Sequence, residues 1–196
     1  MKVIAITRLG NQVTFAPVSI DITENVVFSN QDPQQAHWPT LPTCTNQLGV
    51  APSPNSSECP VPPPSATADP PYTVPYGCRY HSQEQGTINV YAVLAADTTT
   101  LAPAAVNRPI GAQRVVLGGQ PPYAISGQLY QITDAGNRVI QRGNGIGPGL
   151  QLTQGQQGIN VSGTPTVVGT YAFTFTVDDS MGRNLQQTQY TMVVSA

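Results

Sequence analysis

The sequence predicts an all-β protein made of two domains. Val, Ile, Thr, Tyr and Phe recur in short alternating runs, which is the pattern of half-buried strands. No stretch sustains the 3.6-residue apolar period of a helix. Gly and Pro number 18 and 19, so turns must be frequent. A chain of 196 residues is long enough for one large β domain or two small ones.

Charged residues are scarce, at 9% of the chain, and the formal net charge is −2. Polarity comes instead from Gln, Asn, Thr and Ser. Because there is no basic stripe, we expect no nucleic-acid partner. Apolar runs are only a few residues long, so we expect no membrane span. This polar but charge-poor composition favours an extracytoplasmic location, which means the periplasm, the cell surface or the secreted fraction.

Short strands are predicted along the first part of the chain, because each run is β-branched and is bounded by turn residues. A longer strand, Thr87–Leu94, is predicted near the end of this part. The shorter runs are Val3–Ile6, Val13–Phe15, Ser19–Ile22 and Val26–Ser29.

A Pro-rich segment, residues 39–75, interrupts this pattern. Proline lacks the N–H that a sheet needs, so we predict a long inserted loop and not central sheet. Cys44 and Cys59 flank its Ser- and Asn-rich part, and a disulfide between them would stabilise the fold by about 3 kcal/mol. The alternative is two free surface thiols. With the disulfide, Cys78 is the single free thiol, since the chain has 3 cysteines.

The second half of the chain is again rich in strand patterns. Residues 96–106 combine a threonine run with proline and are predicted to be an interdomain linker between domains 1–95 and 107–196. The clearest strand of the second domain is Tyr171–Val177, where large residues alternate with small or polar ones. Tyr190–Val194 continues this pattern at the end.

The chain has only 2 histidines, and both lie where they could meet a cysteine. His81 follows Cys78 by three positions, on a predicted loop that leads into a strand. His37 follows the strand that ends near Asn30. Two histidines and one cysteine with a weak axial ligand form the blue-copper ligand set. The chain therefore contains the donor types of a blue-copper site.

The residues around these ligands resemble the cupredoxin family. Phe15–Ile22 and then Val26–Asp32 are similar to the second and third strands of that family. The motif Cys78-x-x-His81-x-x-Glu84-x-Gly86 is similar to the short ligand loop of amicyanin- and plastocyanin-type members. The resemblance implies a cupredoxin-like Greek-key β-sandwich or barrel over residues 1–95. It also implies that one copper ion is bound per chain by His37, Cys78 and His81.

Glu84 departs from the family pattern, because it stands where the family has an axial methionine. A carboxylate is a harder ligand, so it would stabilise Cu(II), lower the reduction potential and change the blue spectrum. Gln83 and Gln85 are alternative axial ligands, and a three-coordinate site is another. A further alternative is a cupredoxin fold that has lost its copper.

The region after residue 106 resembles an immunoglobulin-like domain that is common in bacterial surface proteins. The resemblance implies an immunoglobulin-like β-sandwich that acts as a spacer, adhesive or assembly module. The region contains no His or Cys, so we find no catalytic set in it. The stretches that carry the resemblance are Gly118–Tyr123, Gly147–Leu150, Ile159–Pro165 and Gly169–Ser180.

Two functions remain open. The copper set predicts one-electron transfer with an unidentified redox partner protein and not an enzyme, because two histidines cannot build a multicopper oxidase cluster. The alternative is a structural or adhesive surface or fibre subunit, with or without metal. Low charge weakens repulsion between copies, and exposed β edges can pair, so self-association is expected in that case. Copper storage or delivery is disfavoured by the lack of Met- or His-rich tracts.

Overall fold

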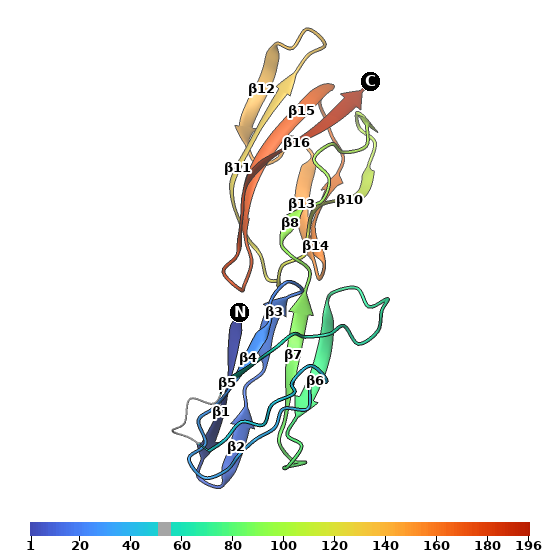
Figure 1. Ribbon diagram of the computed structural model, residues 1–196. Coiled ribbons are helices and arrows are strands. Elements are labelled where there is room, and N and C mark those ends of the chain that lie inside the picture. The colour runs from blue at the N-terminus through green and yellow to red at the C-terminus, as the bar shows by residue number, and fades with distance from the viewer. Residues whose placement is uncertain (51–55) are drawn as a thin grey trace. The chain divides into compact units, whose positions relative to one another are not determined.

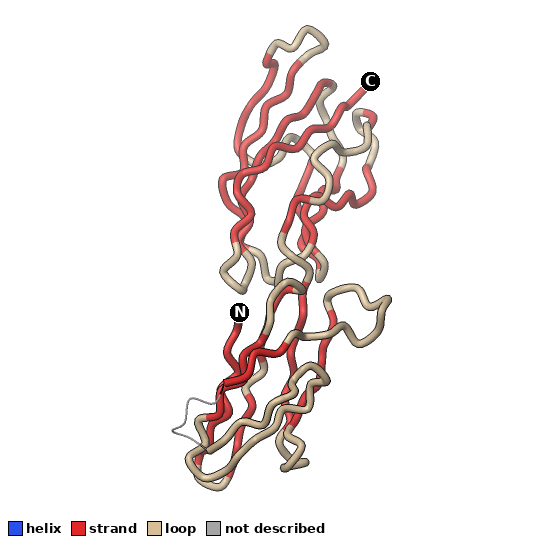
Figure 2. The backbone as a smooth tube through the Cα atoms, in the orientation of Figure 1, coloured by secondary structure: helices blue, strands red, loops and turns tan. Residues whose placement is uncertain are grey.

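The computed structural model describes residues 1–50 and 56–196, which form β-strands and no α-helix (Figures 1 and 2). Their contacts divide the chain into two compact units, Met1–Ala92 and Val93–Ala196, each with a core of its own. The predicted all-β class is confirmed. Within the described residues, there is no helix with the length and apolar character needed to cross a membrane.

The N-terminal unit contains a four-stranded sheet with both parallel and antiparallel neighbours. Strand β1 (Lys2–Leu9) forms an antiparallel hairpin with β2 (Gln12–Phe15). On its other side β1 pairs in parallel with β4 (Val26–Asn30), and β5 (Ser56–Cys59) pairs antiparallel with β4 at the edge. Alternate residues of β1 and β4 point inward, so Ile4, Ile6, Val26 and Phe28 are buried.

The second sheet of this unit has three strands. Strand β7 (Gln85–Tyr91) lies between β3 (Val18–Asp21), which runs parallel to it, and β6 (Tyr72–Gly77), which runs antiparallel. Tyr76 of β6 joins the shared core, where its ring lies edge-on to Phe28 at a centroid distance of 5.1 Å. The two sheets share one apolar core and form a β-sandwich, as the sequence predicts.

The Pro-rich segment 39–75 is not a loop throughout, and the prediction is wrong in this respect. It contains β5 and the first residues of β6. Both strands lie at sheet edges, where one side needs no ladder partner and proline is tolerated, as at Pro75. Residues 51–55 of the segment lie outside the described residues.

The predicted disulfide between Cys44 and Cys59 is present, and both residues are buried. Cys59 is the last residue of β5, so the bond attaches the preceding loop to the edge of the sheet. Trp38 Nε1 donates to the carbonyl oxygen of Cys44 at 3.3 Å. The disulfide therefore also supports the segment that carries His37.

The C-terminal unit is a sandwich of two sheets, as expected for an immunoglobulin-like fold. One sheet has the strand order β13-β14-β10-β8 and the other has the order β12-β11-β15-β16-β9. The bounds of the first are β13 (Leu150–Gly155), β14 (Gly158–Gly163), β10 (Ile110–Leu117) and β8 (Ala95–Ala96). Those of the second are β12 (Val139–Asn144), β11 (Ala124–Thr133), β15 (Gly169–Asp178), β16 (Asn184–Ser195) and β9 (Ala104–Ala105).

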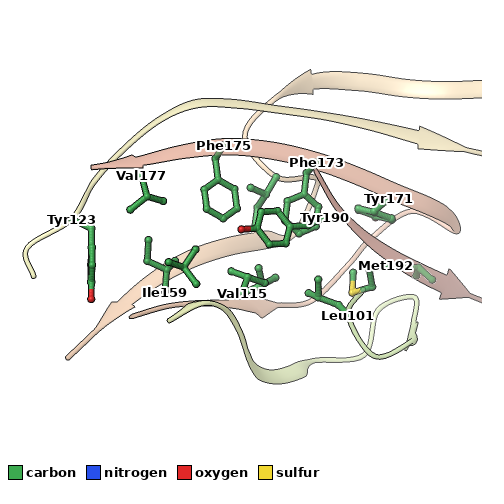
Figure 3. Packing of buried hydrophobic residues seen from close by; sticks show 14 of the residues in the cluster. Leu101, Val115, Tyr123, Ile159, Tyr171, Phe173, Phe175, Val177, Tyr190 and Met192 are labelled. Carbon is green, nitrogen blue, oxygen red and sulfur yellow. The ribbon is translucent and has the colours of Figure 1, made fainter. Parts of the chain in front are cut away.

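The core of this unit follows from the alternation in β15. Tyr171, Phe173 and Phe175 point between the sheets, while the residues between them face outward (Figure 3). Tyr190 of β16 stacks on Phe175 with a centroid distance of 4.8 Å and an interplanar angle of 8°. Large aromatic side chains thus supply much of the buried apolar area.

Residues 96–106, predicted as a linker, belong to the C-terminal unit. The two-residue strand β8 pairs antiparallel with β10, and β9 pairs in parallel with β16. Between them Leu101 enters the core and is only 3% exposed. The sequence did not predict these strands, because two alanines form no alternating apolar pattern. The surrounding threonine and proline residues are instead typical of a linker.

Candidate metal centre

The structure brings together all four of the residues expected to bind metal. One possible donor atom from each of His37, Cys78, His81 and Glu84 lies within 4.8 Å of the others. Glu84 Oε2 is 2.9 Å from His37 Nδ1 and 3.1 Å from His81 Nδ1. Cys78 Sγ is 3.5 Å from His81 Nδ1. The set of donors is two imidazole nitrogens, one sulfur and one carboxylate oxygen.

Three of these residues lie on the short loop between β6 and β7. Cys78 comes directly after β6 and Glu84 directly before β7, so the pairing of these strands fixes both ends of the loop. The Cys78 N–H donates to the Glu84 carbonyl at 3.1 Å. A Cβ at Gly77 would lie 2.7 Å from that carbonyl oxygen, so this tight crossing requires glycine.

His37 reaches the cluster from the segment that follows β4. Its backbone N–H and C=O both bond to Leu48, which fixes the segment against the loop that the disulfide closes. The next residue, Trp38, donates its backbone N–H to Cys78 Sγ at 3.4 Å, and its carbonyl accepts from Arg79 at 2.9 Å. Backbone hydrogen bonds therefore hold the two ligand-bearing segments side by side.

The cluster is largely shielded from solvent. His37 is 0% exposed and Cys78 is 5% exposed, whereas the His81 side chain is 28% exposed. A surface cavity of about 690 Å³ borders Cys78 and Glu84. Of the four side chains, that of His81 is the most exposed to solvent.

Sequence reasoning missed two residues that support the cluster, Asp32 and Arg8. The Nε2 atom of His37 is 3.1 Å from Asp32 Oδ2. Arg8 binds Asp32 through two bonds, of 2.9 Å from Nε and 2.7 Å from a terminal nitrogen. These hydrogen bonds from Arg8 are the main reason that the pKa of Asp32 lies far below its usual range, despite complete burial of the side chain.

The parallel register of β1 and β4 explains why this pair forms. Ile6 of β1 is the partner of Asn30 of β4. Because the two strands run parallel, the residues two positions further along, Arg8 and Asp32, also come opposite each other. The available sequence signal was an Asp five positions before His37. Its partner, 24 residues earlier in the chain, can be recognised only once the register is known.

Trp38 packs beside the ligand loop. The Arg79 guanidinium carbon lies 4.6 Å from the centre of the Trp38 ring, within cation–π range. Tyr80 stands edge-on to the same ring at 6.2 Å. These contacts join Trp38 to two residues of the ligand loop.

No protein-family model matches the chain, and no curated protein matches it by sequence. The solved structures that resemble the chain include two of low sequence identity. The crystal structure of CopC from Methylosinus trichosporium OB3b has 17% identity and a TM-score of 0.29, over 52% of this chain and 91% of that chain. The immunoglobulin tandem domains of titin have 9% identity and a TM-score of 0.41, over 92% of this chain and 93% of that chain.

The fold assignment rests on the strand pairing described above. Each unit is an all-β sandwich, with a four-stranded and a three-stranded sheet in the N-terminal unit and a four-stranded and a five-stranded sheet in the C-terminal unit. The candidate metal site lies entirely within the N-terminal unit.

Proposed function

We propose that the protein is an extracytoplasmic copper-binding protein whose N-terminal unit takes part in one-electron transfer and catalyses no reaction of its own. The observation that carries the proposal is the convergence of two imidazoles, a thiol sulfur and a carboxylate within 4.8 Å. Copper bound there would supply a single-electron redox step. The chain itself would supply the ligands, their orientation and the exclusion of water.

The donor set fits copper in its chemistry. A cysteine sulfur and two imidazoles form a set that suits copper, and cysteine binds a metal as the thiolate. The Trp38 N–H that points at Cys78 Sγ would stabilise negative charge on that sulfur. The oxygen of Glu84 is a harder donor, which favours Cu(II) and would lower the reduction potential.

The extracytoplasmic location is supported by the Cys44–Cys59 disulfide, because such bonds persist mainly in oxidising compartments. Electron exchange with a redox partner would run through His81, because its side chain is 28% exposed while that of His37 is fully buried. The chemical identity of this partner protein is left open by the proposal.

A Cu(II) titration followed by optical absorption and electron paramagnetic resonance tests the proposal. We expect an intense thiolate-to-copper band that saturates at one copper per chain and is absent from Cys78→Ser. Glu84→Gln is the matched variant, because it keeps the size of the side chain and removes its charge. It should retain the band but change its energy and the copper hyperfine splitting. A wild-type protein with reduced Cys78 and no such band would rule out the electron-transfer function.

A structural or adhesive role is the second candidate, and one observation favours it. Strand β12 lies at the edge of its sheet, and its residues Val139 and Ile140 are 50% and 51% exposed. An apolar edge strand can pair with another copy of the chain. Light scattering over a series of protein concentrations separates the two roles, because a protein that stays monomeric throughout argues against assembly.

A further inference from the structure

We propose that Asp32, held in place by Arg8, is a positioning residue that orients His37 for metal binding. The inference rests on the proposed metal site, and it concerns a residue that makes no contact with the ion. Asp32 Oδ2 and His37 Nε2 are 3.1 Å apart, and both side chains are 0% exposed. The contact is shielded from solvent, so the carboxylate helps to set the orientation of the ring.

The guanidinium of Arg8 holds the carboxylate of Asp32 in place through two hydrogen bonds. It donates to both carboxylate oxygens, at 2.9 and 2.7 Å, and its side chain is only 12% exposed. The same guanidinium also donates to Gln35 Oε1 at 2.6 Å. With both oxygens of Asp32 accepting from Arg8, the ring nitrogen of His37 that faces Oδ2 takes the donor role.

The two ring nitrogens of His37 therefore have different roles, one as a hydrogen-bond donor and the other as a candidate metal ligand. Nε2 donates to Asp32, and Nδ1 faces the cluster, 2.9 Å from Glu84 Oε2. A carboxylate that accepts a hydrogen bond from a ligand imidazole fixes the tautomer of that imidazole. It also makes the opposite nitrogen more basic and therefore a stronger metal ligand. Loss of such a partner typically weakens metal binding by about 10- to 100-fold.

The test compares the full-length wild type with Asp32→Asn, which keeps the shape of the side chain and removes its charge. In metal-free protein, NMR of the His37 ring should show a slowly exchanging Nε2 proton that exchanges faster in the variant. Zn(II) affinity, measured by competition with a chelator, should fall by about 10- to 100-fold. Asp21→Asn is the matched control, since Asp21 is also buried in this unit but accepts from Thr23.

Arg8→Lys is the second variant, and it decides the question if Asp32→Asn does not fold. A lysine keeps the positive charge but loses the two-pronged contact, so the Nε2 proton should lose part of its protection and Zn(II) affinity should fall. An unchanged Nε2 proton and unchanged affinity in the folded variants would overturn the inference. A wild type that binds neither Zn(II) nor Cu(II) would instead contradict the proposed function, while the measurement on metal-free protein would still test the positioning role.

Discussion

The hydroxyl group of Tyr190 is buried among the aromatic rings of the C-terminal core. Tyr190 is 0% exposed, and no described residue forms a hydrogen bond of good geometry with its oxygen. Burial raises the pKa of Tyr190 to about 12, and the nearby Thr188 side chain offsets the effect only in part. A buried hydroxyl without a partner costs about 1 to 3 kcal/mol. The hydroxyl group therefore lowers the stability that the buried ring gives to its unit at neutral pH.

We expect Tyr190→Phe to raise the free energy of unfolding by about 1 kcal/mol at pH 7. The raised pKa means that the wild type keeps its full stability below about pH 10 and loses up to about 3 kcal/mol as the pH rises towards 12. The variant should lack that loss. Denaturant unfolding followed by circular dichroism at pH 7 and pH 11 measures both effects. A variant less stable than wild type at pH 7 would show that the hydroxyl has a stabilising partner.

Among single residues, the metal cluster was easier to predict from the sequence than the residues that support it. The chain has only 2 histidines and 3 cysteines, so His37, Cys78 and His81 were conspicuous. Arg8 and Asp32 belong to residue types that normally occupy the surface. Their burial depends on the register of β1 and β4, which no local pattern in the sequence specifies.

At the scale of elements, strongly alternating strands could be predicted and short edge strands could not. The run at Tyr171–Val177 forms the middle of β15, and the run at Val26–Ser29 forms most of β4. Strand β5 reads Ser-Ser-Glu-Cys, which has little β propensity, and it is ordered by pairing with β4. Tertiary pairing therefore decided the structure where local propensity was weak.

The disulfide connects the loop after His37 to strand β5. Neither segment has a sequence pattern that predicts its structure. We expect the double variant Cys44→Ala/Cys59→Ala to lose about 3 kcal/mol of unfolding free energy, because the unfolded chain regains loop freedom. Trp38 is the only tryptophan, so its fluorescence during denaturant unfolding reports on the N-terminal unit alone. Cys78→Ser is the control, since it leaves the disulfide intact. A loss below about 1 kcal/mol would mean that pairing with β4 holds the loop unaided.

For the whole molecule, the presence of two domains could be predicted but their boundary could not. Each unit has its own apolar cluster, and the two clusters share none of the described buried residues. The structural division falls after Ala92, whereas the Thr- and Pro-rich composition suggested a linker at residues 96–106. Composition reports local backbone preferences, and these do not reveal that Leu94 and Leu101 fill the second core.

This difference in boundary predicts how two fragments of the chain behave. Residues 93–196 contain the whole C-terminal cluster, so we expect this fragment to fold alone and to unfold cooperatively. Residues 107–196 lack β8, β9 and both core leucines, which should cost about 5 kcal/mol or more. Thermal unfolding followed by circular dichroism compares them, with Leu101→Ala in the longer fragment as an intermediate case. If both fragments melt at the same temperature, residues 93–106 contribute nothing to this unit and the linker interpretation is restored.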